Sequence, residues 1–133
     1  MFDWKPEYSV HIPGIDAQHK RLFALVAELH TAMSQGKGKT VLQSALTSLV
    51  DYTKAHFAAE EQLMRKYGYP EFAVHKAQHD ELTSQVLDFQ QKFLRHETVM
   101  TVDLMIFLKT WLQNHIIGSD QKYSAYIRSK TAA

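Results

Sequence analysis

Six ionisable side chains fall on the apolar faces of predicted helices, where an ordinary core would have hydrophobic residues. They are His19, His56, Glu60, His75, His79 and His115. Burying such groups without a partner costs several kcal/mol, so they need something to bind. The pairs His56/Glu60 and His75/His79 are each four residues apart, which places both side chains on one helix face, as chelation requires. The pattern therefore predicts a metal site.

The ligand types narrow the choice of metal. The sequence has no cysteine, which excludes thiolate ligands, cysteine nucleophiles and a disulfide framework. Asp120 lies five residues after His115, off the ideal helix face, but a helix that ends at Gly118 would let Asp120 turn back. A shell of imidazoles and carboxylates suits iron better than calcium or magnesium, although zinc and manganese accept the same ligand types.

The number of ligands predicts two metal ions. Five imidazoles and two carboxylates overfill one octahedron but underfill two if each ligand is terminal. If both carboxylates bridge, and an oxo or hydroxo group from solvent bridges as well, the ligands fill eleven of the twelve positions of two octahedra. One position then stays open for a small ligand.

Long helices must position these residues. Every glycine and proline lies outside the long stretches in which apolar residues recur at every third or fourth position, the period of one helix face. The predicted helices cover about 17–35, 40–67, 71–96 and 102–117, with Asp16 and Thr40 as N-caps of the first two. Residues 1–15 form an N-terminal arm and residues 118–133 a C-terminal tail. The expected fold is a single all-α domain, an antiparallel up-down-up-down four-helix bundle.

The bundle topology tests the metal-site hypothesis. In an antiparallel bundle, the start of the first helix, the end of the second, the start of the third and the end of the fourth share one level. The six residues on the apolar faces all fall at that level. Unrelated core histidines would have no reason to do so.

At this point the sequence resembles the hemerythrin family, in particular the single-domain bacteriohemerythrins. The matching stretches are WKPEYSVHIPGIDAQHKRL (4–22), HFAAEEQLM (56–64), HKAQH (75–79) and WLQNHIIGSD (111–120). The resemblance implies a non-haem di-iron centre with one three-histidine iron, one two-histidine iron and two bridging carboxylates. The implied ligands are His75, His79 and His115 on the first iron, His19 and His56 on the second, and Glu60 and Asp120 as bridges.

The resemblance also implies what the centre does. In this family dioxygen binds at the open position of the two-histidine, five-coordinate iron and is held reversibly as a hydroperoxide. Phe57, Trp111, Leu112 and Ile116 match positions that line the oxygen pocket. A shell rich in neutral imidazoles stabilises ferrous iron more than a carboxylate-rich shell would, which favours reversible binding. The expected function is oxygen carriage, storage or delivery, without enzymatic activity.

Other functions are less consistent with the residues. Ferritin-like di-iron oxidases use Glu-x-x-His pairs, which this sequence lacks. An oxygen or redox sensor would have to act on a separate partner, because the 133 residues hold no output module. Iron storage is a further, weaker alternative.

Composition restricts the partners. The 15 lysines and arginines nearly balance the 14 acidic residues and are spread along the chain, which disfavours nucleic acid as a partner. No apolar run approaches the ~20 residues of a membrane span, and the N-terminus lacks the pattern of a signal peptide. A cytoplasmic monomer is therefore expected, with dioxygen as its ligand. Charged residues such as Glu61 are expected on a solvated face.

Overall fold

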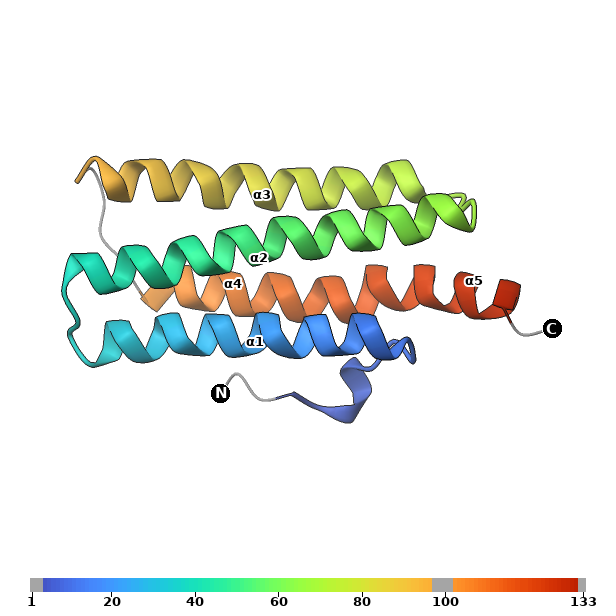
Figure 1. Cartoon of the computed structure of the whole chain (residues 1–133), viewed down its shortest axis with the longest axis horizontal. Coiled ribbons are helices and arrows are strands. Elements are labelled where there is room, and N and C mark those ends of the chain that lie inside the picture. Colours follow the sequence, from blue (N-terminus) through green and yellow to red (C-terminus); the bar gives the residue numbers. More distant parts are fainter. Residues whose placement is uncertain (1–3, 97–101, 132–133) are drawn as a thin grey trace.

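The computed structural model describes residues 4–96 and 102–131, and within these ranges all regular secondary structure is helical. Figure 1 shows four rods side by side, which confirms the predicted all-α bundle. Three rods are single helices, and the fourth consists of three consecutive helical segments. The single helices are α1 (Pro13–Ser34), α2 (Lys39–Lys66) and α3 (Phe72–Leu94), and the fourth rod comprises α4 (Val102–Asn114), the π-helical segment η2 (His115–Asp120) and α5 (Gln121–Thr131).

The apolar faces of the rods form two clusters. The larger runs through the bundle and buries side chains from all four rods, including Leu29 of α1, Leu46 of α2 and Met105 of α4. The smaller cluster joins the end of α2 to α5. Its buried members are Met64, Tyr69, Tyr123 and Ile127. Apolar burial on this scale is the main force that holds the rods together.

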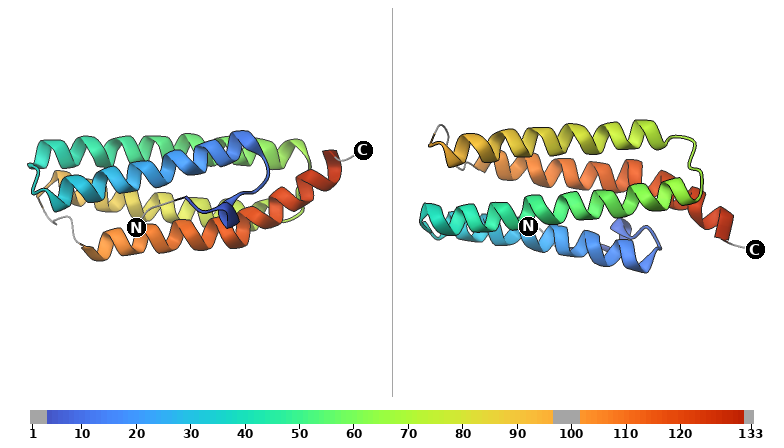
Figure 2. Two further views of the ribbon diagram at one scale, coloured as in Figure 1. Left: turned by 90° about the horizontal axis from the view of Figure 1, so that it is seen from below. Right: turned by 45° about the horizontal axis from the view of Figure 1, so that its top comes forward.

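The N-terminal arm is fixed to α1 by Asp16. The arm includes the short 3₁₀ helix η1 (Pro6–Tyr8), and it folds back beside the bundle (Figure 2). The Asp16 carboxylate accepts hydrogen bonds from the Ser9 hydroxyl at 2.6 Å and from the Val10 N–H at 2.8 Å. The prediction that Asp16 caps the helix was therefore wrong: α1 already begins at Pro13, a residue suited to a first turn, and Asp16 holds the preceding chain instead.

The other predicted boundaries differ by smaller amounts. The second helix begins at Lys39, with Gly38 rather than Thr40 at the N-cap position. The third ends at Leu94, and His96 follows with a φ of 61°. The predicted division between the third and fourth helices, at residues 97–101, lies outside the described residues.

The predicted C-terminal tail was wrong. Gly118 does not end the helix, because the chain continues through η2 into α5, where Tyr123 and Ile127 are buried. The fourth rod changes direction near η2 (Figure 2, left). Among the described residues, no helix combines the length and the hydrophobicity needed to cross a bilayer.

Candidate metal centre

The structure brings the seven predicted ligands together at one level of the bundle. His19 comes from α1 and His115 and Asp120 come from η2, while α2 and α3 each contribute an i, i+4 pair, His56/Glu60 and His75/His79. All seven are buried, with exposed fractions between 0% and 6%. Side chains far apart in the sequence thus form one compact polar cluster inside an otherwise apolar bundle.

Asp120 lies between histidines of three rods. Its Oδ1 is 3.0 Å from Nε2 of His75 and 3.1 Å from Nε2 of His115. Its Oδ2 is 3.1 Å from Nε2 of His19, on the other side of the carboxylate. The two oxygens therefore face different histidines, which is the arrangement a bridging carboxylate needs.

Glu60 has a similar position on α2. Its Oε1 is 3.1 Å from Nε2 of His56 and 3.4 Å from Nε2 of His79. Its Oε2 is 3.5 Å from Nε2 of His19 and accepts a hydrogen bond of 2.5 Å from the Tyr123 hydroxyl. Glu60 thus contacts histidines of α1, α2 and α3, and Tyr123 of α5 holds its second oxygen.

The ligand atoms form two overlapping groups, each with its atoms within 4.8 Å of one another. One group contains three histidines and both carboxylates, and the other contains two histidines and Glu60. The first is His75, His79, His115, Glu60 and Asp120, and the second is His19, His56 and Glu60. The grouping separates the five histidines into three and two.

Several of these buried polar atoms have no hydrogen-bond partner within the protein. They are both ring nitrogens of His19, Nε2 of His75, Oε1 of Glu60 and both carboxylate oxygens of Asp120. Buried polar atoms are nearly always paired, and an unpaired one costs free energy. Converging lone pairs of nitrogen and oxygen are the donors a cation would satisfy, so the residues fit a resident metal.

The π-helical segment η2 explains how His115 and Asp120 meet. In an α-helix, residues five apart point in clearly different directions, as the sequence analysis noted. A π-helix closes its hydrogen bonds over five residues, so residues five apart come to lie on nearly the same face. His115 and Asp120 are the first and last residues of η2, and their side chains approach to 3.1 Å. Sequence reasoning expected a helix end here, and the backbone instead uses a wider turn.

Two side chains outside the ligand set orient the histidines. The Nδ1–H of His56 donates to Oε1 of Gln18 at 2.6 Å, and that of His79 donates to Oε2 of Glu61 at 3.0 Å. Each bond leaves the lone pair of Nε2 directed at the cluster, as is typical behind metal-bound histidines. The expectation that Glu61 is a solvated surface charge was wrong, because its side chain is only 14% exposed.

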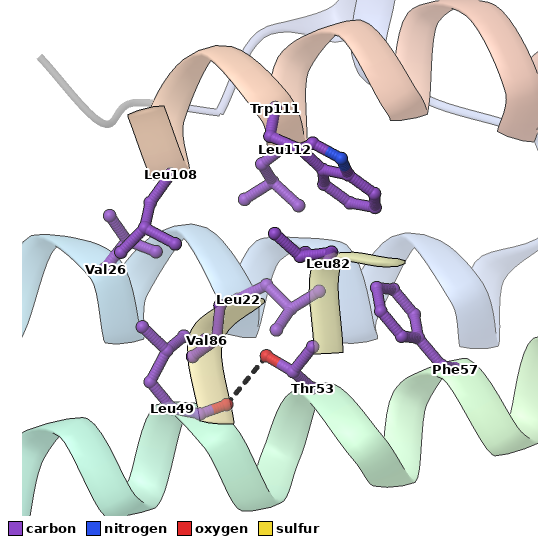
Figure 3. Close-up of a pocket in the computed structure, with 10 residues that line it drawn as sticks. All are labelled: Leu22, Val26, Leu49, Thr53, Phe57, Leu82, Val86, Leu108, Trp111 and Leu112. Carbon is purple, nitrogen blue, oxygen red and sulfur yellow. Dashed lines mark hydrogen bonds between the residues drawn. The ribbon is translucent and has the colours of Figure 1, made fainter. Parts of the chain in front are cut away.

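An apolar cavity of about 30 Å³ adjoins the cluster (Figure 3). Side chains from all four rods line it: Leu22, Val26, Leu49, Thr53, Phe57, Leu82, Val86, Leu108, Trp111 and Leu112. The Thr53 hydroxyl donates to the Leu49 carbonyl at 2.7 Å, so the hydrogen bond of this hydroxyl is already satisfied. The volume exceeds the ~10–15 Å³ that a single water-sized molecule needs, and the apolar walls favour an apolar guest over water.

Three of the four predicted pocket residues line this cavity. Phe57 also stacks on the His79 ring, with the ring centroids 3.8 Å apart. Trp111 stacks on the His115 ring, with the ring centroids 4.4 Å apart. Leu112 lines the wall beside Trp111. Ile116 is fully buried in the larger apolar cluster but is not among the lining residues. The cavity therefore meets the cluster through rings that touch histidines.

The electrostatics of the cluster favour a cation. Burial raises the pKa of Glu60, but the charge of His56 and the close polar contacts of the His19, His56 and His79 rings outweigh burial and hold this pKa well below its usual value. Burial and the charge of Glu60 raise the pKa of Asp120, but the close polar contacts of His115, His19 and His75 outweigh both and leave this pKa below its usual value. Both carboxylates are thus ionised at neutral pH, and their negative charge attracts cations.

His19 makes the stability of the metal-free chain depend on pH. Burial alone would lower its pKa, but the close contacts and negative charges of Asp120 and Glu60 raise the pKa from 6.5 to about 9. A pKa raised in the folded state means that the bound proton stabilises the fold. This contribution is complete below pH 6.5 and is lost as the pH rises through about 9.

We therefore expect the melting temperature of chelator-treated protein to fall between pH 6.5 and about 9. Melting followed by circular dichroism measures this. His19→Gln should remove most of the dependence, while His11→Gln, at an exposed position of the arm, should keep it. A melting temperature that stays constant over this range in the unaltered chain would contradict the assigned pKa of His19.

The fold and this buried cluster describe a four-helix bundle whose core could hold a metal, and known proteins are similar to this chain. A family model described as the hemerythrin HHE cation-binding domain matches residues 10–127. This chain therefore belongs to the hemerythrin family, which confirms the resemblance inferred from the sequence.

Named relatives cover most of the chain. A bacteriohemerythrin of Methylococcus capsulatus is 38% identical over 117 residues, which are 88% of each chain. A bacteriohemerythrin of Stenotrophomonas maltophilia is 33% identical over 126 residues, 95% of this chain and 81% of the relative. A crystal structure of wild-type hemerythrin superposes with a TM-score of 0.90 at 36% identity, covering 94% of this chain and 96% of the other.

Proposed function

We propose that this chain binds dioxygen reversibly at a pair of non-haem irons held by the buried cluster. His75, His79 and His115 would hold one iron, His19 and His56 the other, and Glu60 and Asp120 would bridge the two. The observation that carries the proposal is the convergence of five buried imidazoles on two buried carboxylates that each face histidines of several helices. The bacteriohemerythrin relatives support the same assignment.

The pair of irons, when bound, supplies the reversible two-electron chemistry that takes up and releases dioxygen. The protein supplies the setting for that chemistry. Gln18 and Glu61 fix the direction of two imidazoles through hydrogen bonds to Nδ1. Tyr123 holds one oxygen of Glu60, and the cavity beside Phe57 offers a small apolar volume for the gas while excluding water.

The composition of the shell favours carriage over catalysis. Five neutral imidazoles add no negative charge, whereas each additional carboxylate would favour higher oxidation states of iron. The cavity of about 30 Å³ that adjoins the cluster is of a size for a diatomic molecule.

Cycling the purified protein between air and vacuum tests the proposal. Iron is counted per chain, the protein is reduced without oxygen, and air is then admitted while the visible charge-transfer band is recorded. We expect two irons per chain and a band that appears with air and disappears when oxygen is removed, over repeated cycles. Irreversible oxidation in the first cycle, or fewer than two irons, would contradict reversible carriage at a di-iron centre.

The wall of the cavity predicts how long the oxygenated form lasts. Leu112 is buried and presents a branched apolar side chain to the cavity. Asparagine is similar to leucine in size but carries an amide that attracts water and anions. We therefore expect Leu112→Asn to autoxidise several-fold faster, in a chain that is less stable but still folded. The decay of the oxygenated band measures this, with Leu104→Asn, partly buried elsewhere on α4, as the control. Equal decay in the Leu112 variant and the unaltered chain would refute a protective role of the wall.

A further inference from the structure

A row of tyrosines leads from the metal cluster toward the surface at the α5 end of the bundle. The Tyr123 hydroxyl donates to Glu60, and the Tyr123 ring centroid lies 5.2 Å from that of His75. Tyr69 follows at 6.4 Å from Tyr123, and Tyr126 follows at 5.5 Å from Tyr69. Tyr123 is fully buried, Tyr69 is 8% exposed and Tyr126 is half-buried. The row thus connects the buried cluster to solvent without a break.

Aromatic rings that follow one another in space are good paths for electrons. Electron tunnelling slows exponentially with distance, and it is coupled better through contacting π-systems and hydrogen bonds than through gaps. The row joins the cluster at two points, through a hydrogen bond to the proposed bridging carboxylate and through an edge contact with a proposed histidine ligand. A role in packing alone would not require both contacts.

The outer end of the row lies in a basic aromatic surface, which we call the aromatic patch. It consists of Tyr67, Phe72 and Tyr126, each with a cation over its ring. The cations are Arg65 at 4.9 Å from Phe72, Lys66 at 5.4 Å from Tyr67 and Lys130 at 5.3 Å from Tyr126. The Tyr126 hydroxyl also donates to the Gly68 carbonyl at 3.3 Å, which joins α5 to the turn after α2. Arginine and aromatic residues are enriched in protein interfaces.

The charge of the two segments that carry the aromatic patch differs from that of the whole chain. Residues 62–72 and 121–131 contain five basic residues and one acidic residue, Glu71. They carry a net charge of four positive, and since the whole chain is formally +1, the remaining residues are three negative. The near-neutral total therefore conceals the basic charge of the two segments that carry the aromatic patch. Such a charge asymmetry steers an acidic partner to these segments.

We propose that the aromatic patch docks an acidic one-electron carrier protein, and that Tyr126, Tyr69 and Tyr123 conduct its electrons to the metal centre. The inference rests on the proposed function, because a di-iron oxygen carrier that autoxidises must be reduced again. Two carriers would each lose one electron, and the two electrons would convert two ferric ions to two ferrous ions, with charge balanced by protons from solvent. The tyrosines stay protonated and serve as a coupling path, without being oxidised themselves.

Docking is tested with a plant-type [2Fe–2S] ferredoxin as an acidic one-electron probe. Its affinity for the iron-loaded chain is measured by calorimetry at low salt. Lys66→Glu combined with Lys130→Glu should weaken binding by about tenfold or more and flatten its salt dependence, because both charges lie in the patch. The control variant combines Lys37→Glu with Lys54→Glu, which makes the same charge change at exposed positions outside the patch. It should bind the ferredoxin far more tightly than the patch variant does.

The route is tested by the rate at which the reduced ferredoxin bleaches the band of the oxidised protein. Tyr69→Leu should slow this reduction by roughly tenfold at unchanged affinity, because the smaller side chain leaves a gap in the row. Tyr69→Phe keeps the ring and should retain most of the rate. Tyr52→Leu removes a half-buried tyrosine of α2 that packs on the larger apolar cluster, and it should leave the rate unchanged. Tyr126→Leu is a second route variant at a half-buried position.

The outcomes separate this inference from the proposed function. A reduction rate that is equal in Tyr69→Leu, Tyr126→Leu and the unaltered chain overturns the route. Equal affinity in the two double-charge variants overturns the docking surface. Failure of the proposed function appears separately, as fewer than two irons or no reversible oxygenation in the unaltered chain. The affinity comparison between the two double-charge variants can still be made on such a chain, because the exchanged lysines are not among the proposed ligands.

Discussion

Asp120→Asn is expected to lower bound iron from two ions per chain to well below two. Both oxygens of Asp120 face histidine nitrogens within 3.1 Å, from α1, α3 and η2, and neither has a hydrogen-bond partner in the protein. The amide has nearly the same shape but carries no charge and a nitrogen in place of one oxygen. Since losing a mere outer-shell partner costs about 10–100-fold in metal affinity, losing a bridging carboxylate should cost more. Iron per chain after loading and desalting measures the effect.

The matched control is Asp80→Asn, which removes an exposed carboxylate one residue after His79. Asp80 pairs with Lys76 at the surface, and such pairs are worth about 0.5 kcal/mol or less, so iron content and melting should stay unchanged. Circular dichroism shows whether the Asp120 variant still folds. A folded Asp120 variant that retains two irons with the spectrum of the unaltered chain would refute the bridging role.

Removing the metal from the unaltered chain should lower its melting temperature. A metal that binds buried ligands in the folded state alone adds its binding free energy to folding. The Asp120 variant loaded with iron should therefore melt near the temperature of the metal-free chain. The loaded unaltered chain should melt higher than both.

The sequence predicted that the candidate ligands cluster, because their positions follow from two regular features. Helical periodicity placed His56 with Glu60 and His75 with His79 on single faces, and the antiparallel topology placed both pairs at one level. Neither feature depends on the details of side-chain packing. The structure brings all of these residues into one cluster, and the positions of the rods alone account for it.

Residues outside the ligand set were not predictable in the same way. Gln18, Glu61 and Tyr123 neighbour ligands in the sequence or the fold, but their roles depend on rotamers that only packing determines. Glu61 is one residue after Glu60 and therefore points away from the face that Glu60 occupies, yet its carboxylate reaches Nδ1 of His79 on the neighbouring helix. Spacing along one helix carries no information about such contacts between helices.

The continuation of the fourth rod was missed because glycine suggested a stop. A weak opposing signal was present, since Asp120, Tyr123 and Ile127 recur at intervals of three and four and form one helix face. A π-helical segment leaves no clear mark on residue types, because it is a local change in hydrogen bonding. Its functional consequence is large, since it sets the direction of Asp120 and of every α5 side chain that follows.

Inserting one alanine between Gly118 and Ser119 should therefore disable the centre and destabilise the fold. A helix turns about 100° per residue, so Asp120, Tyr123 and Ile127 would rotate away from the interior together. The centre would lose a carboxylate, and Glu60 would lose the hydroxyl that donates to it. Exposing Tyr123 and Ile127, now 0% and 4% exposed, should lower the free energy of unfolding by about 3 kcal/mol or more. Iron per chain and urea unfolding measure the two effects.

Two controls separate helix register from disturbance of the backbone. Gly118→Ala should keep both iron and stability, because a Cβ at this position meets no atom within 4 Å and its backbone is not left-handed. An alanine inserted after Ser129 makes the same insertion in the last turn of α5, where Lys130 and Thr131 are exposed, and it should leave the centre intact. If the insertion after Gly118 retained two irons and full stability, the directions of Asp120 and α5 would not depend on the turn between them, and the role assigned to η2 would be wrong.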